Sequence, residues 1–280
     1  MRVIICGVRG STPAPGPEFV RYGGHTSCVA LCHDGQPPSL ILDAGTGIRR
    51  VTALLEGQPF RGAILLGHLH WDHSQGLPFF VAGDRPDASV ELFIPSQGDP
   101  EDVLTGMMSA PFFPITPSEL QGKWRFSALE AGEHQIEGFT VTALDIPHKG
   151  GRSFGYRISD GTSTIAYLSD HSPTSIGPGT DELGEHHDTA MQLARGCDLL
   201  IHDGQYTDAE LPSRISWGHA SCGYAVGFAR AAHAGRVLLF HHEPSRSDNA
   251  IDEIVASFSG AGLRVDAAAE GMIIDLPRRD

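Results

Sequence analysis

Five short apolar runs, spread over most of the chain, each end in a histidine or an aspartate. They lead into His68, His148, Asp170, the pair His202 and Asp203, and the pair His241 and His242. Their aliphatic and β-branched composition predicts buried β-strands. In sheets of this kind, functional groups gather beyond the carboxyl ends of the strands, where rigid scaffold meets variable loop. A common metal centre at one sheet edge would explain all five endings.

The densest of these endings is the stretch "HLHWDH", which runs from His68 to His73. His68 and His70 alternate, so on an extended tip both side chains point the same way. Asp72 and His73 follow on the turn, where they can face a second ion. A lone His-x-His is more often a surface loop. With distant histidine and aspartate partners at other strand ends, the motif predicts a site for zinc, with manganese or iron as alternatives.

Further apolar runs predict sheets covered by helices in layers. Strands are expected at 3–7, 40–43, 63–66, 90–94, 139–144, 154–158, 164–168, 199–202, 237–240 and 272–276, and helices at 74–82, 182–195, 221–234 and 249–258. The sequence has no repeat or linker, which predicts a single domain over 1–280.

The glycine-rich stretch 7–13 lacks a phosphate-loop pattern and is expected to be a turn. The proline-rich segment Pro111–Lys123 is a lid, a subunit contact or an ordered connecting loop.

Composition limits the partners of the chain. The 34 acidic residues outnumber the 20 basic ones, for a net charge of −14. This charge disfavours a broad nucleic-acid-binding face, which needs clustered Lys and Arg. No apolar run is long enough to cross a membrane, and the first residues lack the long apolar region of a signal peptide. The five cysteines form no Cys-x-x-Cys pair, so a reduced, cytoplasmic setting is expected.

"HLHWDH" resembles the signature of the metallo-β-lactamase-fold superfamily, and His148, Asp170 and His241 match its later motifs in order. "GVRGSTPAPGPEFVRYGGHTSC" and "LILDAGTGIRR" resemble its ribonuclease Z-like and cyclic-nucleotide phosphodiesterase-like branch. The resemblance covers essentially the whole chain. It implies an α/β (α+β) fold, a four-layer αββα sandwich with two mixed β-sheets face to face, helices outside and a dinuclear metal site at one edge.

The resemblance also implies a ligand set for two divalent ions, Zn²⁺ first, with Mn²⁺ or Fe²⁺ as alternatives. It assigns His68, His70 and His148 to one ion, Asp72, His73 and His241 to the other, and Asp170 to both. Sequence alone leaves His241 and His242 open as the last ligand. We favour His241 because it directly follows its strand. Asp43, His242 and His202 are expected to support the ligands from outside.

Two further stretches bear on proton transfer. "LLIHDGQY" and "WGHAS" stand where the ribonuclease Z-like branch carries His-Glu-Ala-Thr and His-Ser-Thr. Asp203 replaces the glutamate, and His219 matches the histidine. Because aspartate is one methylene shorter, the pair must close up or be lost. We expect His219, oriented by Asp203, to protonate the leaving oxygen. The alternative is that Asp203 only ends a strand and His219 caps a helix starting near Ala220.

Together these features predict a dinuclear-metal-dependent phosphodiesterase. A metal-bridging hydroxide would attack phosphorus, Asp72 would orient it, and the Asp203/His219 pair would supply the proton. The expected substrate is a small phosphodiester, such as a cyclic nucleotide. A ribonuclease Z-like endonuclease acting on an RNA 3′ end is an alternative, disfavoured by the acidic charge and the lack of a basic arm. A lactonase or thioesterase would not need the proton donor. A non-catalytic module is disfavoured because no expected ligand is missing. A homodimer is one option, and no membrane partner is expected.

Overall fold

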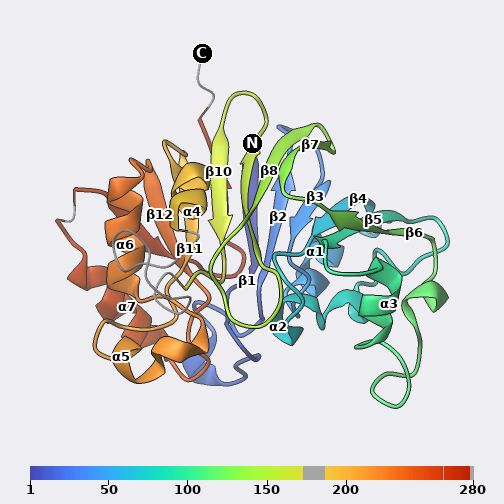
Figure 1. Ribbon diagram of the computed structural model, residues 1–280, viewed down its shortest axis with the longest axis horizontal. Coiled ribbons are helices and arrows are strands. Elements are labelled where there is room, and N and C mark those ends of the chain that lie inside the picture. Colours follow the sequence, from blue (N-terminus) through green and yellow to red (C-terminus); the bar gives the residue numbers. More distant parts are fainter. Residues whose placement is uncertain (173–186, 261, 278–280) are drawn as a thin grey trace.

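The computed structural model describes residues 1–172, 187–260 and 262–277. Two seven-stranded sheets pack face to face (Figure 1). In spatial order the first sheet contains β14 (Ile273–Asp275), β1 (Arg2–Gly7), β2 (Cys28–Cys32), β3 (Leu40–Leu42), β4 (Arg61–Leu65), β5 (Ser89–Pro95) and β6 (Lys123–Leu129). The second contains β13 (Arg264–Ala267), β12 (Arg236–Phe240), β11 (Leu199–Asp203), β10 (Thr164–Leu168), β9 (Phe154–Ser159), β8 (Phe139–Asp145) and β7 (Gly132–Ile136).

Both sheets are mixed. Strands β3 to β6 run parallel in the first sheet, and β10 to β13 run parallel in the second. The remaining neighbours pair antiparallel, as β1 does with β2 and β8 with β9. Strands β4, β8, β10, β11 and β12 all end at the same edge of the sandwich, the lower end in Figure 1, where α2 (Trp71–Ser74) and α5 (Leu211–Arg214) also lie.

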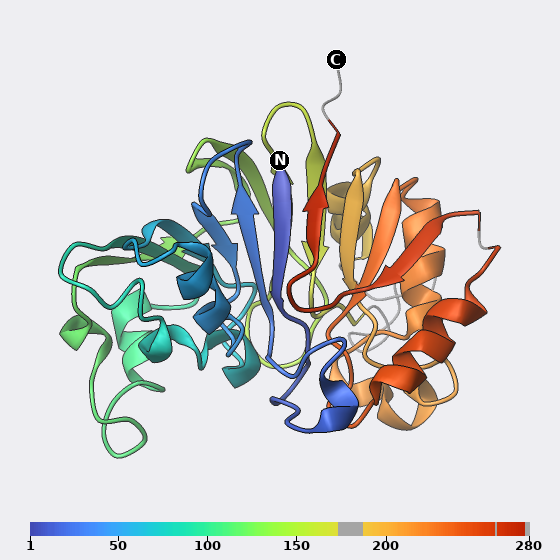
Figure 2. The same cartoon turned by 180° about the vertical axis from the view of Figure 1, so that it is seen from behind.

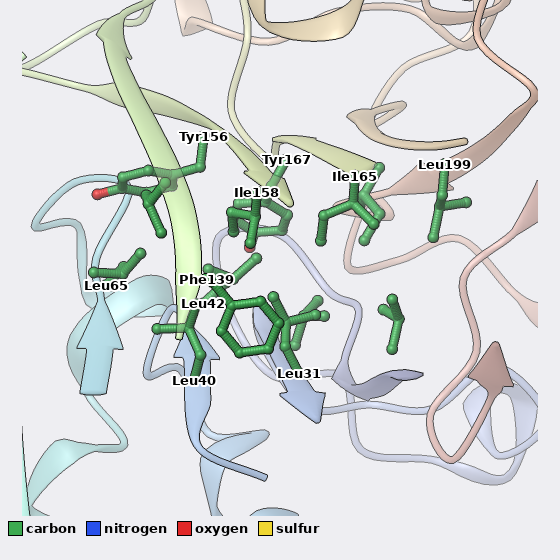
Figure 3. Close-up of a cluster of buried hydrophobic side chains, with 14 of the residues drawn as sticks. Leu31, Leu40, Leu42, Leu65, Phe139, Tyr156, Ile158, Ile165, Tyr167 and Leu199 are labelled. Carbon is green, nitrogen blue, oxygen red and sulfur yellow. The ribbon is translucent and has the colours of Figure 1, made fainter. Parts of the chain in front are cut away.

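The core between the sheets follows from alternation along each strand. Val3 and Ile5 of β1 point into the space between the sheets, whereas Ile4 and Cys6 point outward. Successive side chains of a strand face opposite sides, so every apolar strand contributes to two layers. Figure 3 shows Leu31, Leu40 and Leu42 of the first sheet meeting Phe139 and Ile158 of the second.

Helices cover the outer face of each sheet (Figures 1 and 2). On the first sheet, α1 (Ile48–Leu54) packs on β1 and β2, and α3 (Pro100–Thr105) contacts β6. On the second, α4 (His187–Ala194) packs on β8 to β10, α6 (Cys222–Ala231) on β11 and β12, and α7 (Asp248–Ser257) on β13. The four-layer αββα sandwich expected from the sequence is therefore confirmed. No helix in the described part of the chain has the length and apolarity that a membrane crossing needs.

All the expected strands are present, with ends displaced by no more than two residues, but the described residues contain four others, β2, β6, β7 and β13. The helix expected at 74–82 is wrong, because α2 stops at Ser74 and a separate 3₁₀ turn, η2 (Leu77–Phe79), follows. Pro78 accounts for the break, because it has no N–H to donate to the Ser74 carbonyl. Part of the helix expected at 182–195 falls outside the described residues.

The expected connecting segment Pro111–Lys123 is shorter than the sequence suggested. It contains a 3₁₀ turn, η3 (Pro117–Glu119), whose capping box joins Thr116 and Glu119, and it ends before Lys123, the first residue of β6. Short helical turns also occur at η1 (Pro17–Phe19) and η4 (Ile215–Trp217).

Candidate metal centre

The loop after β4 and the start of α2 present the "HLHWDH" side chains to the sheet edge. His70 is the last extended residue before α2, and Asp72 and His73 lie in the first turn of that helix. The hydroxyl of Ser74 donates to the His70 carbonyl at 2.8 Å, and the Gly67 N–H donates to Asp43 Oδ1 at 2.7 Å. These bonds hold both ends of the loop, so the extended tip and the helical turn face one centre.

The structure brings the seven expected ligand residues together in two groups. One contains His68, His70, His148 and Asp170, and the other contains Asp72, His73, Asp170 and His241; in each group the ligand atoms lie within 4.8 Å of one another. Asp170 belongs to both groups. Its Oδ2 lies 3.7 Å from Nε2 of both His68 and His148, and its Oδ1 lies 3.0 Å from Nε2 of His73. Each carboxylate oxygen therefore faces one group.

The burial of this cluster fits a pair of cations. Within the described ranges, both ring nitrogens of His68 and both carboxylate oxygens of Asp170 are buried without a hydrogen-bond partner. Leaving a buried polar group unpaired costs about 1–3 kcal/mol, and more for a charged group. Imidazole nitrogens and carboxylate oxygens are ligands that divalent metals such as zinc prefer. The donor set and its unpaired atoms therefore match a metal site.

The electrostatics of the cluster favour an ionised Asp170 and neutral imidazoles at His68 and His148. Burial would raise the pKa of Asp170, but His241, His73 and His68 outweigh it and hold this pKa well below its ordinary value. Burial lowers the pKa of His148 to about 4 and keeps the pKa of His68 well below its ordinary value. Ionised carboxylates and neutral imidazoles are the protonation states that bind metal.

The pKa of His73 shifts in the opposite direction to those of His68 and His148. Burial lowers the pKa of His73, but the carboxylates around its ring, led by Asp170 and followed by Asp43, outweigh this and raise it well above its ordinary value. The carboxylates that stabilise the protonated His73 ring would equally stabilise a metal cation bound to that ring instead of the proton.

Three of the histidines are held from behind by an oxygen acceptor. His73 Nδ1 donates to Asp43 Oδ2 at 2.7 Å, His148 Nδ1 to the Gly218 carbonyl at 2.7 Å, and His241 Nδ1 to Gln205 Oε1 at 2.9 Å. Each bond fixes the ring tautomer and aims Nε2 at the cluster. Asp43 thus contacts His73 on the side of the ring away from the cluster. Gln205 was missed, although it follows Asp203 by two residues in the stretch "LLIHDGQY".

Asp203 and His219 are in contact despite the shorter aspartate. His219 Nδ1 donates to Asp203 Oδ2 at 2.8 Å, and the His219 ring stacks on the His241 ring at 4.9 Å between centroids. Burial lowers the pKa of His219, but Asp203 outweighs it, so the net pKa is raised. The helix-capping alternative is wrong, because Ser221 caps α6 through the Tyr224 N–H.

His202 and His242 make hydrogen bonds to backbone carbonyls outside the two ligand groups. His202 Nδ1 donates to the Asp203 carbonyl at 2.8 Å, and His242 Nε2 donates to the Ala268 carbonyl at 2.9 Å. Among the described residues, neither joins a potential metal-ligating group. Because His241 adopts a positive φ of 59°, its ring turns to the cluster while the next residue turns away. Neither histidine is thus placed among the potential ligands of the described chain, and a supporting role for them stays a prediction.

The glycine-rich stretch near the N-terminus is more than a turn. A Cβ on Gly10 would lie 2.3 Å from Nδ1 of His241, so only glycine fits beside that ring. The next residue, Ser11, donates its backbone N–H to Asp72 Oδ2 at 2.6 Å. A cavity of about 390 Å³ opens over the cluster, lined by Ser11, Leu69, His70, Trp71, Asp72, Asp170 and His219.

The sequence and fold of this chain are similar to those of known proteins. The family model described as "Beta-lactamase superfamily domain" matches residues 39–242. The ribonuclease Z of Halobacterium salinarum is 23% identical, over 100% of this chain and 99% of its own. YhfI of Bacillus subtilis, a metallo-β-lactamase fold protein, superposes with a TM-score of 0.73 at 18% identity, covering 98% of this chain and 99% of that one. Zn²⁺-bound PqqB of Methylobacterium extorquens superposes with a TM-score of 0.70 at 18% identity, covering 99% and 100%.

Proposed function

The chain belongs to the β-lactamase superfamily of metal-dependent hydrolases, and we propose that it is a dinuclear phosphodiesterase for a small phosphodiester. One observation carries this proposal. His219, which is hydrogen-bonded to Asp203, lines the cavity together with members of both metal-ligating groups.

The proposed ligand set follows the two groups of the cluster. His68, His70 and His148 would hold one cation, Asp72, His73 and His241 the other, and Asp170 both. Zinc is proposed first because the donors are imidazole and carboxylate, and the related fold of PqqB is Zn²⁺-bound. When bound, two such cations lower the pKa of a coordinated water to about 7 and stabilise negative charge on phosphoryl oxygens.

Two further tasks, orienting the attacking water and protonating the leaving oxygen, would fall to side chains of the cavity. Asp72, held by the Ser11 N–H, lines the cavity, where its carboxylate would orient the attacking water. His219 is fixed through Nδ1 by Asp203, which leaves Nε2 to give a proton to the departing oxygen. An alkoxide is a poor leaving group and needs this proton, whereas a thiolate leaves more readily. The pair therefore favours a phosphodiester over a thioester.

The lining of the cavity favours a small substrate over RNA. The relative in Halobacterium salinarum is a ribonuclease. In this chain, none of the described residues lining the cavity is a lysine or an arginine, and the net charge is −14. Polynucleotide binding depends on basic side chains that displace counterions along the backbone.

The test compares leaving groups at constant metal content. Wild-type protein should hydrolyse both bis-p-nitrophenyl phosphate and diphenyl phosphate, whose phenolate is the poorer leaving group, with little activity on a lactone or thioester. His219→Ala should lose about 10²–10⁴-fold on diphenyl phosphate, with a smaller loss on the nitrophenyl ester. Metal analysis should still find two ions, and His134→Ala, far from the cluster on β7, should behave as wild type. Full activity of His219→Ala on diphenyl phosphate would remove the proposed acid.

A further inference from the structure

A second cavity, of about 540 Å³, lies beside the candidate metal centre, and Trp71 forms part of both walls. Its lining residues are Trp71, Gln75, Pro78, Phe79, Gly106, Met107, Met108, Phe112 and Phe113. We call it the Trp71 cavity. It combines the helical turn of "HLHWDH" with the loop that follows α3.

The position of Trp71 ties this cavity to the chemistry. Trp71 stands between His70 and Asp72 in the sequence, and Gln75 follows one helical turn later on the same wall. Because Trp71 lines both cavities, an ester group on a phosphoryl at the cluster that extends past Trp71 would enter the Trp71 cavity. His219 does not line this cavity. The group that enters it is therefore the ester group that stays on phosphorus, opposite the protonated leaving oxygen.

The walls of the Trp71 cavity are aromatic and exposed. Trp71 is 75% exposed and Phe112 is 80% exposed, while Phe79 meets Phe113 edge to face at 5.8 Å. Large apolar side chains gathered at one surface usually mark a binding site. Flat rings are what aromatic faces and methionine sulfurs bind best. None of the lining residues carries a charge, so a phosphate backbone finds no partner here.

We propose that the Trp71 cavity binds a flat aromatic group on the retained ester of the substrate, and so selects aryl or heteroaromatic phosphodiesters over alkyl ones. This inference rests on the proposed function of the neighbouring cluster. It adds the substrate class that the cluster alone does not define.

The first test measures binding without turnover. Zinc-loaded protein is titrated with phenylphosphonate and with methylphosphonate, which share the anionic head and differ only in the ring. Wild-type protein should bind the phenyl compound about tenfold more tightly, as expected for partial burial of one ring. Trp71→Ala and Phe112→Ala should each bring the ratio of dissociation constants near one. Phe112 is so exposed that its removal leaves the core intact. Val81→Ala, exposed but outside the cavity, is the control and should keep the wild-type ratio.

The second test measures selectivity in turnover. Bis-p-nitrophenyl phosphate and methyl p-nitrophenyl phosphate release the same leaving group and differ only in the retained ester. The ratio of their kcat/KM values should fall about tenfold in Trp71→Ala, with metal content unchanged.

The outcomes separate the two proposals. If both diesters are hydrolysed but Trp71→Ala keeps both ratios, the aromatic site is wrong and the phosphodiesterase stands. If neither diester is hydrolysed, the proposed function is wrong, and the phosphonate titration alone decides the aromatic site. Sedimentation gives a third outcome. If wild-type protein sediments as a dimer and Trp71→Ala as a monomer, while the ratio of the two phosphonate dissociation constants is unchanged, a second copy of the chain covers the cavity and the inference is overturned.

Discussion

Replacing Asp43 by asparagine should weaken metal binding without disturbing the fold. Asp43 is fully buried and adopts a positive φ of 58°, a conformation that asparagine also tolerates. Its Oδ2 accepts hydrogen bonds from His73 Nδ1 at 2.7 Å and from the Tyr167 hydroxyl at 2.6 Å, while Oδ1 accepts from the Gly67 N–H at 2.7 Å. The carboxylate is therefore an acceptor at both oxygens, and an amide cannot be.

Either orientation of the asparagine amide leaves one bond unmade. If its NH₂ faces Gly67, two donors meet. If it faces His73, the ring must move its proton to Nε2 and lose the lone pair that points at the cluster. Loss of a carboxylate that orients a metal-bound histidine typically costs 10–100-fold in metal affinity, or about 1.4–2.7 kcal/mol.

Calorimetric titration of chelator-treated protein with Zn²⁺ measures this effect. Asp43→Asn should lower the affinity of one of two sites by about 10–100-fold, the site formed by Asp72, His73 and His241, and leave the other close to wild type. Asp198→Asn is the matched control, since Asp198 accepts from the Thr164 N–H away from the cluster. Two unchanged zinc affinities in folded Asp43→Asn would refute the reasoning.

Three further outcomes follow from the same geometry. Gly10→Ala should push the His241 ring aside, since the new Cβ would lie 2.3 Å from its Nδ1, and metal analysis should fall from two ions to one. Tyr167→Phe removes one of the donors to Asp43 and should weaken the same zinc site less than Asp43→Asn does, as titration will show. Removing metal with a chelator should lower Tm by about 5–10 °C in scanning calorimetry, and a rise in Tm would contradict the fit of a cation to the cluster. A single two-state transition in the same scan would support the prediction of one domain over 1–280.

Most buried strands were predicted from the sequence because a short apolar run is a local signal. The missed strands are those whose formation depends on their place in the sheet. Strands β6, β7 and β13 lie at sheet edges, and polar residues interrupt their apolar pattern. Strand β2, CVALC, is flanked by cysteines and divided by an alanine, so it lacks the unbroken aliphatic run that marked buried strands such as β3. In β6, however, Trp124, Phe126 and Ala128 alternate with polar residues, a local signal that was missed.

The same distinction applies to the site. The ligand histidines stand out because chemistry-bearing residues follow several strands. Gln205 does not directly follow a strand, so the sequence gives no signal for it. Its contact with His241 depends on the pairing of β11 with β12. Asp203 of β11 lies opposite Phe240 of β12 in a parallel pair, so the residues that follow both strands emerge side by side. Gln205 thereby reaches His241, a relation that only the register defines.

The loop around Gly218 links metal ligation to proton donation. The Gly218 carbonyl accepts from His148 Nδ1, and the next residue, His219, donates to Asp203. A positive φ of 96° at Gly218, and a Cβ position only 3.0 Å from Cβ of Lys149, leave room for glycine alone. The loop thus lies close to both His148 and Asp203. A shift of this loop would therefore move a proposed metal ligand and the proposed acid together.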